Sequence, residues 1–344
     1  MNKTIVFICI LIMCLLMGCK HDGPALAKPQ RAVYYWRTSF VLSGAEKEFL
    51  KKHEVGRMYV RLFDVVAGDE GPMPNRTITF RDDVPKGVEV VPVVFLEEGL
   101  FNDERSALPQ MLVERVEQIM TQHDLSWKEL QVDFDWTVCN QENYFAFLES
   151  VRAELGKRGK GLSATIRLHQ LAMTPPPVDY GVLMVYNIGK YADKEEPNSI
   201  LTKENLQPYQ PYLSDYDLPL ATALPLYAWD LAFHCGEFQG IAHGVDGGDT
   251  TLYKPLREEG RREYIVVRYH IVDNSPVTDM GSLHLYPGDV IRHEECSADV
   301  LMEARRLLHA ERKNVVEQVI LYHLDEENIK RYKYEDVETL YSGY

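Results

Sequence analysis

Eight short apolar runs, separated by longer segments that mostly have helical patterns, constrain the fold of this 344-residue chain more than any other feature. Several of the runs are almost continuously apolar, which is typical of strands buried on both faces of a parallel sheet. The predicted strands are residues 32–36, 57–63, 88–95, 130–136, 162–168, 181–187, 219–227 and 319–324.

The segments between these strands predict helices. Ser43 and Glu46 form the sequence signature of a capping box at a helix start. Apolar residues at helical spacing predict further helices at 108–123, 141–157, after Thr202 and at 297–310. The alternation of strands and helices predicts an α/β fold, a (β/α)₈ TIM barrel, whose functional sites lie at the carboxyl ends of the strands. Residues 68–86 and 173–179 show no clear barrel helix.

Residues 231–296 exceed what a barrel needs, because they separate the seventh predicted strand from its helix. They contain an alternating run at 264–272, a second short run at 282–286 and turn signals such as Pro287-Gly288. Long connections are usually functional or disordered, and this one has too many aromatic residues for disorder. We therefore expect a β-rich insertion over the barrel mouth, within a single domain that spans residues 32–344.

The amino-terminal residues have the pattern of a secretion signal. Lys3 precedes the apolar run 5–17, whose 13 residues span about 20 Å as a helix, less than the roughly 30 Å of a membrane core. Leu16-Met17-Gly18-Cys19 resembles the bacterial lipoprotein box. We expect a signal peptide at 1–18, lipid on Cys19 and a tether at 19–31. A plain secretion signal with a chance cysteine is the alternative.

The lipid would hold the protein in the bacterial cell envelope almost permanently. Because no Asp follows Cys19 directly, we expect the outer membrane, and the face stays open. A net charge of −15, from 37 basic and 52 acidic residues, argues against a nucleic-acid partner. Of the other mature cysteines, Cys139, Cys235 and Cys296, at most one pair can form a disulfide, and the shared insertion suggests Cys235–Cys296.

Metal and cofactor sites are not expected. His234, Cys235, Glu237 and His243 are residue types that bind metals, but they have no recognised spacing, and a hairpin surface is the favoured interpretation. No phosphate-binding loop or dinucleotide motif occurs either, so the sequence predicts no cofactor.

Two carboxylates on one strand are the strongest chemical signal. In the run 130–136, alternation places Asp133 and Asp135 on the same face, roughly 6.6–7 Å apart. In a barrel this face points into the lumen, where a buried charge must have a partner. Because strand-end carboxylates in this fold usually belong to the site, we predict a functional pair. The alternative is a structural pair held by an arginine such as Arg61 or Arg167.

The segment Asp133-Phe134-Asp135-Trp136 resembles the DxxDxDxE signature of glycoside hydrolase family 18, the chitinases and endo-β-N-acetylglucosaminidases. Two further segments are similar to motifs of that family: Met184-Val185-Tyr186-Asn187 to Met-x-Tyr-Asp, and Leu224-Pro225-Leu226-Tyr227 to Pro-x-Tyr. The likeness covers most of the barrel from about 32 to 229, and then the last strand. The chain also resembles uncharacterised bacterial barrel proteins with a Q-x-DFD strand, which implies no activity.

Three positions depart from the family pattern. The first Asp of the signature falls on Leu130, the proton-donating Glu on Thr137 and the sixth-strand Asp on Asn187. In the family's substrate-assisted reaction the Glu protonates the departing oxygen, while the preceding Asp orients the acetamido group that acts as nucleophile. Threonine cannot deliver a proton near neutral pH. The resemblance therefore carries over Asp133, Asp135 and Tyr186 as residues that line the site, without the acid.

A relocated acid is one way in which the site could still hydrolyse a sugar. Glu97 and Glu98 follow the third strand, and Asp64 follows the second. Binding without turnover is the other possibility, and strand-end aromatic rings suit both because their flat faces stack on sugar rings. The predicted ligand-binding residues are Trp36, Arg167, His169, Tyr186, Asn187, Tyr227, Trp229 and Tyr322.

Three functions follow from these observations. We rank first a lipid-anchored glycan-binding protein on a chitinase-like barrel. Second is a glycoside hydrolase acting on glycans that contain N-acetylhexosamine or a related sugar, using Asp133 and Asp135 with a relocated acid. Third is a non-catalytic envelope scaffold or assembly lipoprotein. The expected partners are a glycan and the membrane, and the sequence points to no particular protein partner.

Overall fold

The computed structural model describes residues 30–68, 71–101, 108–257, 262–274, 281–312 and 314–343. The predicted signal peptide, the lipidated Cys19 and the tether up to residue 29 lie outside these described residues. Within the described part of the chain, no helix is long and apolar enough to cross a membrane.

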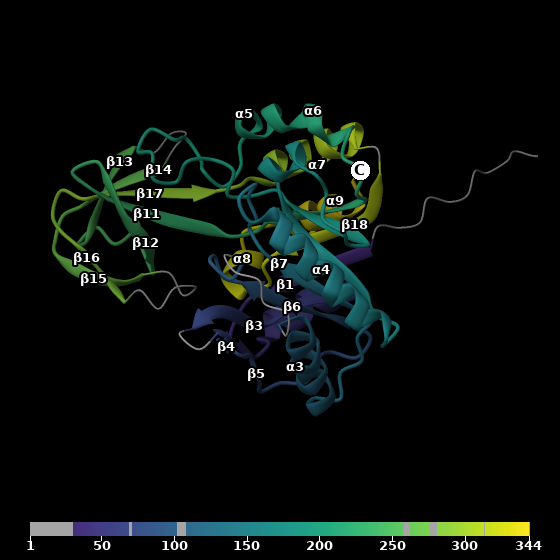
Figure 1. The fold of residues 1–344 in the computed structure, drawn as a ribbon. Helices are drawn as coiled ribbons and strands as arrows, with labels where there is room; N and C mark the ends of the chain where they lie inside the picture. The colour runs from purple at the N-terminus through teal and green to yellow at the C-terminus, as the bar shows by residue number, and fades with distance from the viewer. Residues whose placement is uncertain are drawn as a thin grey trace, which may run out of the picture.

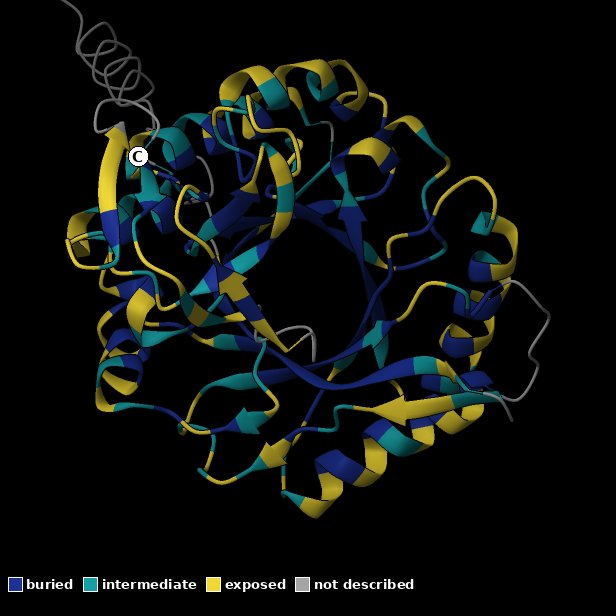
Figure 2. Ribbon diagram, turned by 90° about the vertical axis from the view of Figure 1, so that its left-hand side faces the viewer, coloured by how far each residue is buried: buried dark blue, intermediate teal, exposed yellow. Residues whose placement is uncertain are grey.

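Eight parallel strands close into a barrel, as the sequence predicts (Figure 1). β1 (Gln30–Tyr35) pairs with β18 (Val315–Tyr322) on one side and β3 (Arg57–Gly68) on the other, which closes the circle. The strands between β3 and β18 are β6 (Glu89–Leu96), β7 (Glu129–Asp133), β8 (Gly161–Arg167), β9 (Tyr180–Met184) and β10 (Leu220–Pro225). Figure 2 shows their ring as largely buried, inside helices whose outer faces are exposed.

The longer barrel helices lie where the sequence predicts them. They are α2 (Gly44–Lys52), α3 (Leu108–Gln122), α4 (Gln141–Gly156) and α7 (Ala298–Glu311). The capping box of α2 is confirmed, since Ser43 Oγ accepts the Glu46 N–H and Glu46 Oε2 accepts the Ser43 N–H. Apolar side chains of α3 at the predicted spacing are buried against the barrel. Helix α9 (Tyr334–Ser342) packs near the chain start, because the Tyr341 hydroxyl donates to the Ala32 carbonyl.

Other connections are short or extended. After β3, the chain forms β4 (Gly71–Asn75), antiparallel to β3, and β5 (Thr79–Phe80), which pairs with β2 (Ser39–Phe40). Proline at positions 72 and 74 disfavours a helix there. The remaining short helices are η1 (Leu168–Ala172), α5 (Lys203–Leu206), η2 (Gln207–Tyr209), α6 (Gln210–Leu213) and α8 (Glu326–Ile329).

The predicted insertion is present between β10, the seventh barrel strand, and helix α7. It forms one seven-stranded sheet in the order β13-β14-β17-β11-β12-β15-β16, which Figure 1 shows extending outward from the barrel. A small core of its own includes Tyr253, Leu285 and Ile291. Its strands are β11 (Ala228–His234), β12 (Glu237–His243), β13 (Tyr253–Arg257), β14 (Arg262–Val266), β15 (His270–Asn274), β16 (Ser282–Leu285) and β17 (Val290–Glu295).

One predicted strand of the insertion is wrong. The alternating run 264–272 is two strands, because β14 ends at Val266 and β15 begins at His270. β14 pairs with β17, whereas β15 pairs with β12 and β16. The predicted single strand is therefore split in two, and Tyr269 and Ile271 are exposed.

The suggested Cys235–Cys296 disulfide is also wrong, since Cys139, Cys235 and Cys296 are all free thiols. Cys235 follows the carboxyl end of β11, and Cys296 follows the carboxyl end of β17. Because these two strands are antiparallel, the cysteines lie at opposite ends of a ladder about 20 Å long. A disulfide requires Cα atoms within about 7 Å.

Candidate functional site

Asp133 is the last residue of β7, and its carboxylate is buried at the carboxyl end of the barrel. Its Oδ1 accepts hydrogen bonds from the Thr165 hydroxyl at 2.6 Å and from Arg167 Nη2 at 3.0 Å, both on β8. This ion pair gives the buried charge the partner it requires. The alternative prediction, a carboxylate held by Arg167, therefore describes Asp133 correctly. A quarter of the Arg167 side chain is exposed.

Asp135 has a different environment from the one its strand position predicts. β7 ends at Asp133, so Asp135 lies on the segment that follows, with 59% of its side chain exposed. Gln170 Nε2 donates to Asp135 Oδ1 at 3.3 Å, and His169 Nε2 lies 3.3 Å from the same oxygen. Both partners belong to η1, directly after β8. The two carboxylates thus have separate partners, and only Asp135 is open to solvent.

Thr137 lies four residues before α4, in the turn that leads into the helix. Its backbone N–H donates to Asn140 Oδ1 at 2.8 Å, and its hydroxyl accepts the Cys139 N–H at 3.3 Å. Its carbonyl accepts the N–H groups of Asn140 and Gln141. The Thr137 side chain is therefore an exposed hydroxyl with a local backbone role.

Asp64, the first suggested replacement acid, is buried and ion-paired. Arg61 Nε donates to Asp64 Oδ1 at 2.6 Å, and Arg61 Nη2 donates to Oδ2. Residues three apart on a regular strand point to opposite faces, but the register of β3 against β6 shifts between Arg61 and Phe63. This irregularity lets the two side chains meet. Asp64 is thereby held as the partner of a buried cation.

Glu97 and Glu98 are exposed on the turn after β6. In the ladder between β6 and β7, Phe95 pairs with Asp133. Glu97 and Asp135 therefore each follow the end of one of two neighbouring strands, Glu97 after β6 and Asp135 after β7.

A continuous series of aromatic rings runs around the mouth, which we call the mouth row. It starts with Tyr34 and Trp36, whose ring centroids are 5.9 Å apart, and Trp36 lies 5.9 Å from Tyr322. The row continues through Tyr186, Tyr227 and Trp229, with centroid distances of 4.8 Å, 6.1 Å and 5.6 Å between successive rings. Tyr34, Tyr322 and Trp229 lie on β1, β18 and β11, whereas Trp36, Tyr186 and Tyr227 lie on the segments that follow β1, β9 and β10. Tyr34 and Tyr186 are buried, and the other four are partly exposed.

Trp229 extends the mouth row into the insertion. Its indole N–H donates to Glu294 Oε2 at 2.6 Å, and the Ser199 N–H and hydroxyl donate to the same oxygen. Glu294 also pairs with Arg292, which donates to the carbonyls of Tyr191, Asp193 and Lys194. This buried network fixes Trp229 and places the half-exposed Tyr191 ring 6.5 Å from it.

Asn187, which takes the place of the family's sixth-strand Asp, accepts a hydrogen bond from the Tyr227 hydroxyl. It is exposed and has a φ of +56°, a left-handed conformation that Asn tolerates better than most residues. Asn187 therefore orients a ring of the mouth row.

The hydroxyls of the mouth row remain protonated over the physiological range. Burial raises the pKa of Tyr186 and of Tyr227, with a further rise from the neighbouring Tyr322. Next to Tyr322, burial lowers the pKa of His323 to about 4, so its imidazole is neutral at pH 7. The mouth therefore offers neutral donors and ring faces around the Asp133–Arg167 pair.

Sequence reasoning missed several residues that build this region. It selected Trp36 but not Tyr34, although alternation along β1 places both on the same face. It also missed Thr165 and the Arg292–Glu294 pair, whose two-residue spacing on β17 was a usable signal. Metal binding has no structural support, since the described residues contain no group of three His, Cys, Asp or Glu that could hold an ion.

No protein-family model matches the sequence, and no curated protein does. Solved structures match over most of the chain. For a chitinase from Chromobacterium violaceum ATCC 12472, the TM-score is 0.52 at 14% identity, covering 88% of this chain and 98% of that one. For the spore cortex-lytic enzyme SleL of Bacillus megaterium QM B1551, the TM-score is 0.53 at 12% identity, covering 93% of this chain and 75% of that one.

A Group IV chitinase of Ostrinia furnacalis is similar too, with a TM-score of 0.52 at 11% identity, covering 92% of this chain and 98% of the chitinase. Identities this low show a shared fold. The likeness confirms the chitinase-like barrel that the strand motifs predict. The chain therefore has the (β/α)₈ barrel fold of the chitinases, with a β-rich insertion after the seventh strand.

Proposed function

We propose that this protein binds a glycan at the mouth of its barrel and does not hydrolyse it by the route of glycoside hydrolase family 18. The observation that carries the proposal is the mouth row beside the Asp133–Arg167 pair. Aromatic faces combined with a few fixed polar groups are the usual composition of a specific small-molecule site. The solved structures named as chitinases support a sugar as the ligand class, because this chain shares their fold.

The contacts of the site suggest how a sugar would be held. The partly exposed rings of Trp36, Tyr227 and Trp229 offer faces on which the C–H groups of a sugar ring can stack. Arg167 Nη1 is buried and has no hydrogen-bond partner among the described residues, so it can donate to a ligand oxygen. Asp135 and His169 supply exposed polar groups at the rim.

The same contacts argue against the family's reaction. Thr137 cannot donate a proton near neutral pH, Asp133 is committed to Arg167, and Asp64 is committed to Arg61. A general acid contributes about 10²–10⁴ in rate. A bound glycan would therefore stay intact.

Binding can be tested on a glycan array with the purified protein, followed by titration of the best ligand. Trp229→Ala should weaken binding about tenfold or more, because it removes a stacking face. Trp229→Phe should keep most of the affinity, since it keeps a ring but loses the bond to Glu294. The matched control is Tyr212→Ala, an exposed aromatic on α6 outside the mouth row. Equal affinity of Trp229→Ala and the native protein would reject the mouth as the binding site.

Hydrolysis is the second candidate, favoured by the exposed Glu97, which follows β6, the strand that pairs with β7. Release of reducing ends from N-acetylglucosamine polymers measures it directly. If Glu97 is a relocated acid, Glu97→Gln and Asp135→Asn abolish the release, whereas Glu98→Gln preserves it. Binding without release supports the glycan-binding function. Neither binding nor release would leave a non-catalytic envelope scaffold as the remaining function.

We also propose that lipid on Cys19 anchors the protein, in the outer membrane of a bacterial envelope. The support is the sequence alone: an apolar run too short to span a bilayer, followed by a lipobox-like Leu16-Met17-Gly18-Cys19. Metabolic labelling with a palmitate analogue should mark the native protein and not Cys19→Ala. Fractionation of the envelope then tests the membrane assignment.

A further inference from the structure

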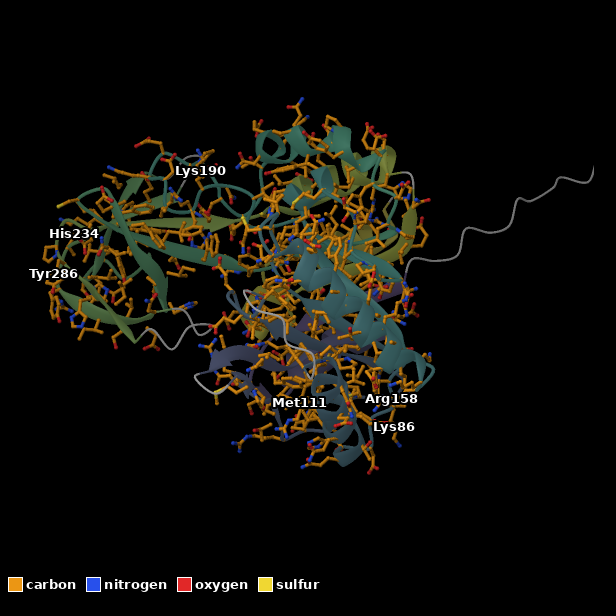
Figure 3. The ribbon with its side chains drawn as sticks, viewed as in Figure 1. Lys86, Met111, Arg158, Lys190, His234 and Tyr286 are labelled. Atoms are coloured by element: carbon orange, nitrogen blue, oxygen red, sulfur yellow. The ribbon has the colours of Figure 1, made fainter. Side chains whose placement is uncertain are left out.

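The outer end of the insertion carries a second group of rings, remote from the mouth. Figure 3 labels two of them, His234 and Tyr286, at the end of the insertion that is farthest from the barrel. In the β15–β16 ladder, His270 pairs with Leu285 and Ile271 pairs with His284. Continuing this register by one residue places Tyr269 opposite Tyr286. Tyr269, Ile271, His284 and Tyr286 therefore share one face of the hairpin.

This face is exposed, although it is rich in apolar and aromatic surface. Tyr269 is 46% exposed, Ile271 52% and Tyr286 48%, whereas Leu283 and Leu285 on the opposite face are buried. The Tyr269 ring lies 5.2 Å from Tyr286 and 6.0 Å from His284. The His234 ring lies 6.3 Å from Tyr286. We call His234, Tyr286, Tyr269 and His284 the distal row.

A buried carboxylate holds the distal row in place. Asp289 is 3% exposed, and its Oδ1 lies 2.6 Å from His234 Nδ1. Its Oδ2 accepts the Tyr286 N–H at 2.8 Å, and its own N–H donates to the Tyr286 carbonyl. Tyr269 Oη and His284 Nδ1 are 2.9 Å apart, which ties the other two rings together. Because burying a carboxylate costs free energy, these contacts indicate a pre-arranged surface.

We propose that the distal row is a second glycan-binding site, which takes an extended, uncharged polysaccharide. The exposed rings, tilted by 40° to 68° against one another, offer several separate apolar faces to sugar rings. Tyrosine hydroxyls and imidazoles can form hydrogen bonds with sugar hydroxyls. The row contains no Lys, Arg, Asp or Glu, and the whole chain has a net charge of −15. Both facts disfavour an anionic partner such as a nucleic acid or an acidic lipid surface.

The distal site does not depend on the mouth. Its residues belong to β11, β16 and the segments that flank β15 and β16, and none of them contributes to the mouth row. A short oligosaccharide can fill the mouth alone, whereas a polymer sheet or fibre presents many chains to the exposed hairpin face. The two sites therefore respond to different forms of the ligand.

The test is retention of the purified protein on insoluble chitin and cellulose, beside titration with soluble N-acetylglucosamine oligomers. The double variant Tyr269→Ala/Tyr286→Ala should lose about tenfold or more of its retention on at least one polymer. The double variant Tyr269→Trp/Tyr286→Trp should retain it, because stacking faces remain. Trp229→Ala and Tyr212→Ala are the mouth and surface controls, and neither should abolish polymer retention.

The proposal would be overturned if the alanine double variant were retained on both polymers as well as the native protein is. It would also be overturned if the native protein were retained on neither. A dimer that the double variant dissociates, without change in retention, would assign the face to self-association instead. The substituted side chains are half exposed, so circular dichroism should report an unchanged fold. If the mouth binds no oligomer but retention still requires the distal row, this inference survives the failure of the proposed mouth function.

Discussion

The two ends of the barrel hold buried charges in different ways. At the amino end, Glu129 accepts hydrogen bonds from the Tyr180 hydroxyl at 2.5 Å and the Ser163 hydroxyl at 3.2 Å, and it lies 3.5 Å from Arg57 Nη1. Arg57 also donates to Glu89, and Tyr59 Oη lies 2.7 Å from Tyr180 Oη. This network crosses the lumen and connects β3, β6, β7, β8 and β9.

At the mouth, the charges form two local pairs, Arg61–Asp64 and Arg167–Asp133. The first pair lies within one strand and the second joins two neighbours, so neither spans the lumen. Aromatic rings, several of them partly exposed, occupy the rest of the rim. Similar residue types thus cross-link the strands at one end and leave ring faces open at the other. In this fold the amino end contributes mainly to stability and the carboxyl end to function.

The largest expected effect is at the amino end. Arg57→Met removes the cation that faces Glu129 and Glu89, and breaking a buried pair costs about 3–5 kcal/mol. Urea unfolding measures this loss. The control is Arg152→Met, whose pair with Asp179 is about half exposed and should contribute about 0–1 kcal/mol. If both variants lost the same unfolding free energy, the buried pairs at the amino end would contribute no more to stability than a surface pair.

The second effect is a pH dependence at the mouth. Burial lowers the pKa of His323 from 6.5 to about 4, opposed by Asp325 and assisted by Arg37. Between these pH values the His323 imidazole is protonated in the unfolded chain and neutral in the folded chain. The free energy of unfolding therefore falls as the pH drops from 6.5 to 4. The loss is at most about 3 kcal/mol, and His323→Gln should remove it in urea unfolding across that range.

Glu129 at the amino end should show the opposite sign. Burial raises the pKa of its carboxyl group, and the Tyr180 hydroxyl and Arg57 counteract the rise. Its contribution to stability is therefore fully present below the ordinary value of 4.5 and is lost as the pH rises through the folded-state pKa. Glu129→Gln should reduce the pH dependence of the unfolding free energy above pH 4.5. His323→Gln should reduce that dependence mainly below pH 6.5. The same slope in both variants would contradict the contrast between the two ends.

A smaller loss is expected for Asp133→Asn, which removes the charge that Arg167 faces. Hydrogen bonds to charged groups contribute about 1.5–3 kcal/mol, and the partial exposure of Arg167 favours the lower part of that range, so we expect about 2 kcal/mol. Glycan affinity should fall as well, because Arg167 loses its fixed orientation. A variant as unstable as Arg57→Met would show that the mouth is as tightly cross-linked as the amino end.

The smallest effect is expected between the two ends. Tyr34 donates to Gln131 Oε1 at 2.7 Å in the middle of the lumen, and Tyr34→Phe should cost about 1 kcal/mol. The double variant Tyr34→Phe/Gln131→Leu should recover most of the loss, since it leaves no buried amide without a partner. Thermal unfolding of the three proteins tests this expectation.

The strands and longer helices were predictable because their patterns are local. Near-continuous apolar runs mark strands that helices cover on the outside, and the Ser43–Glu46 signature marks a helix start without reference to the rest of the fold. The absence of a carboxyl group at residue 137 is likewise visible in the sequence. Local patterns were therefore enough to predict the architecture.

Contacts between residues far apart in the sequence were harder to predict from the sequence. The run 264–272 alternates equally well as one strand or as two, and only pairing with β16 shows that Tyr269 and Ile271 face solvent. The contact of Asp135 with His169 and Gln170 depends on a strand that ends at Asp133, three residues before the end of the predicted strand. Tyr34 was missed because three aromatic residues in succession hide which of them faces inward.

The stalk of the insertion limits how the molecule can deform. β11 and β17 leave the barrel together and stay paired from Ala228 opposite Glu295 to Phe233 opposite Val290. A ladder of backbone hydrogen bonds resists hinge-like bending, so the outermost hairpin keeps a constant separation and orientation relative to the rim. If both proposed sites bind one polymer, this stalk sets the spacing between the two points of contact.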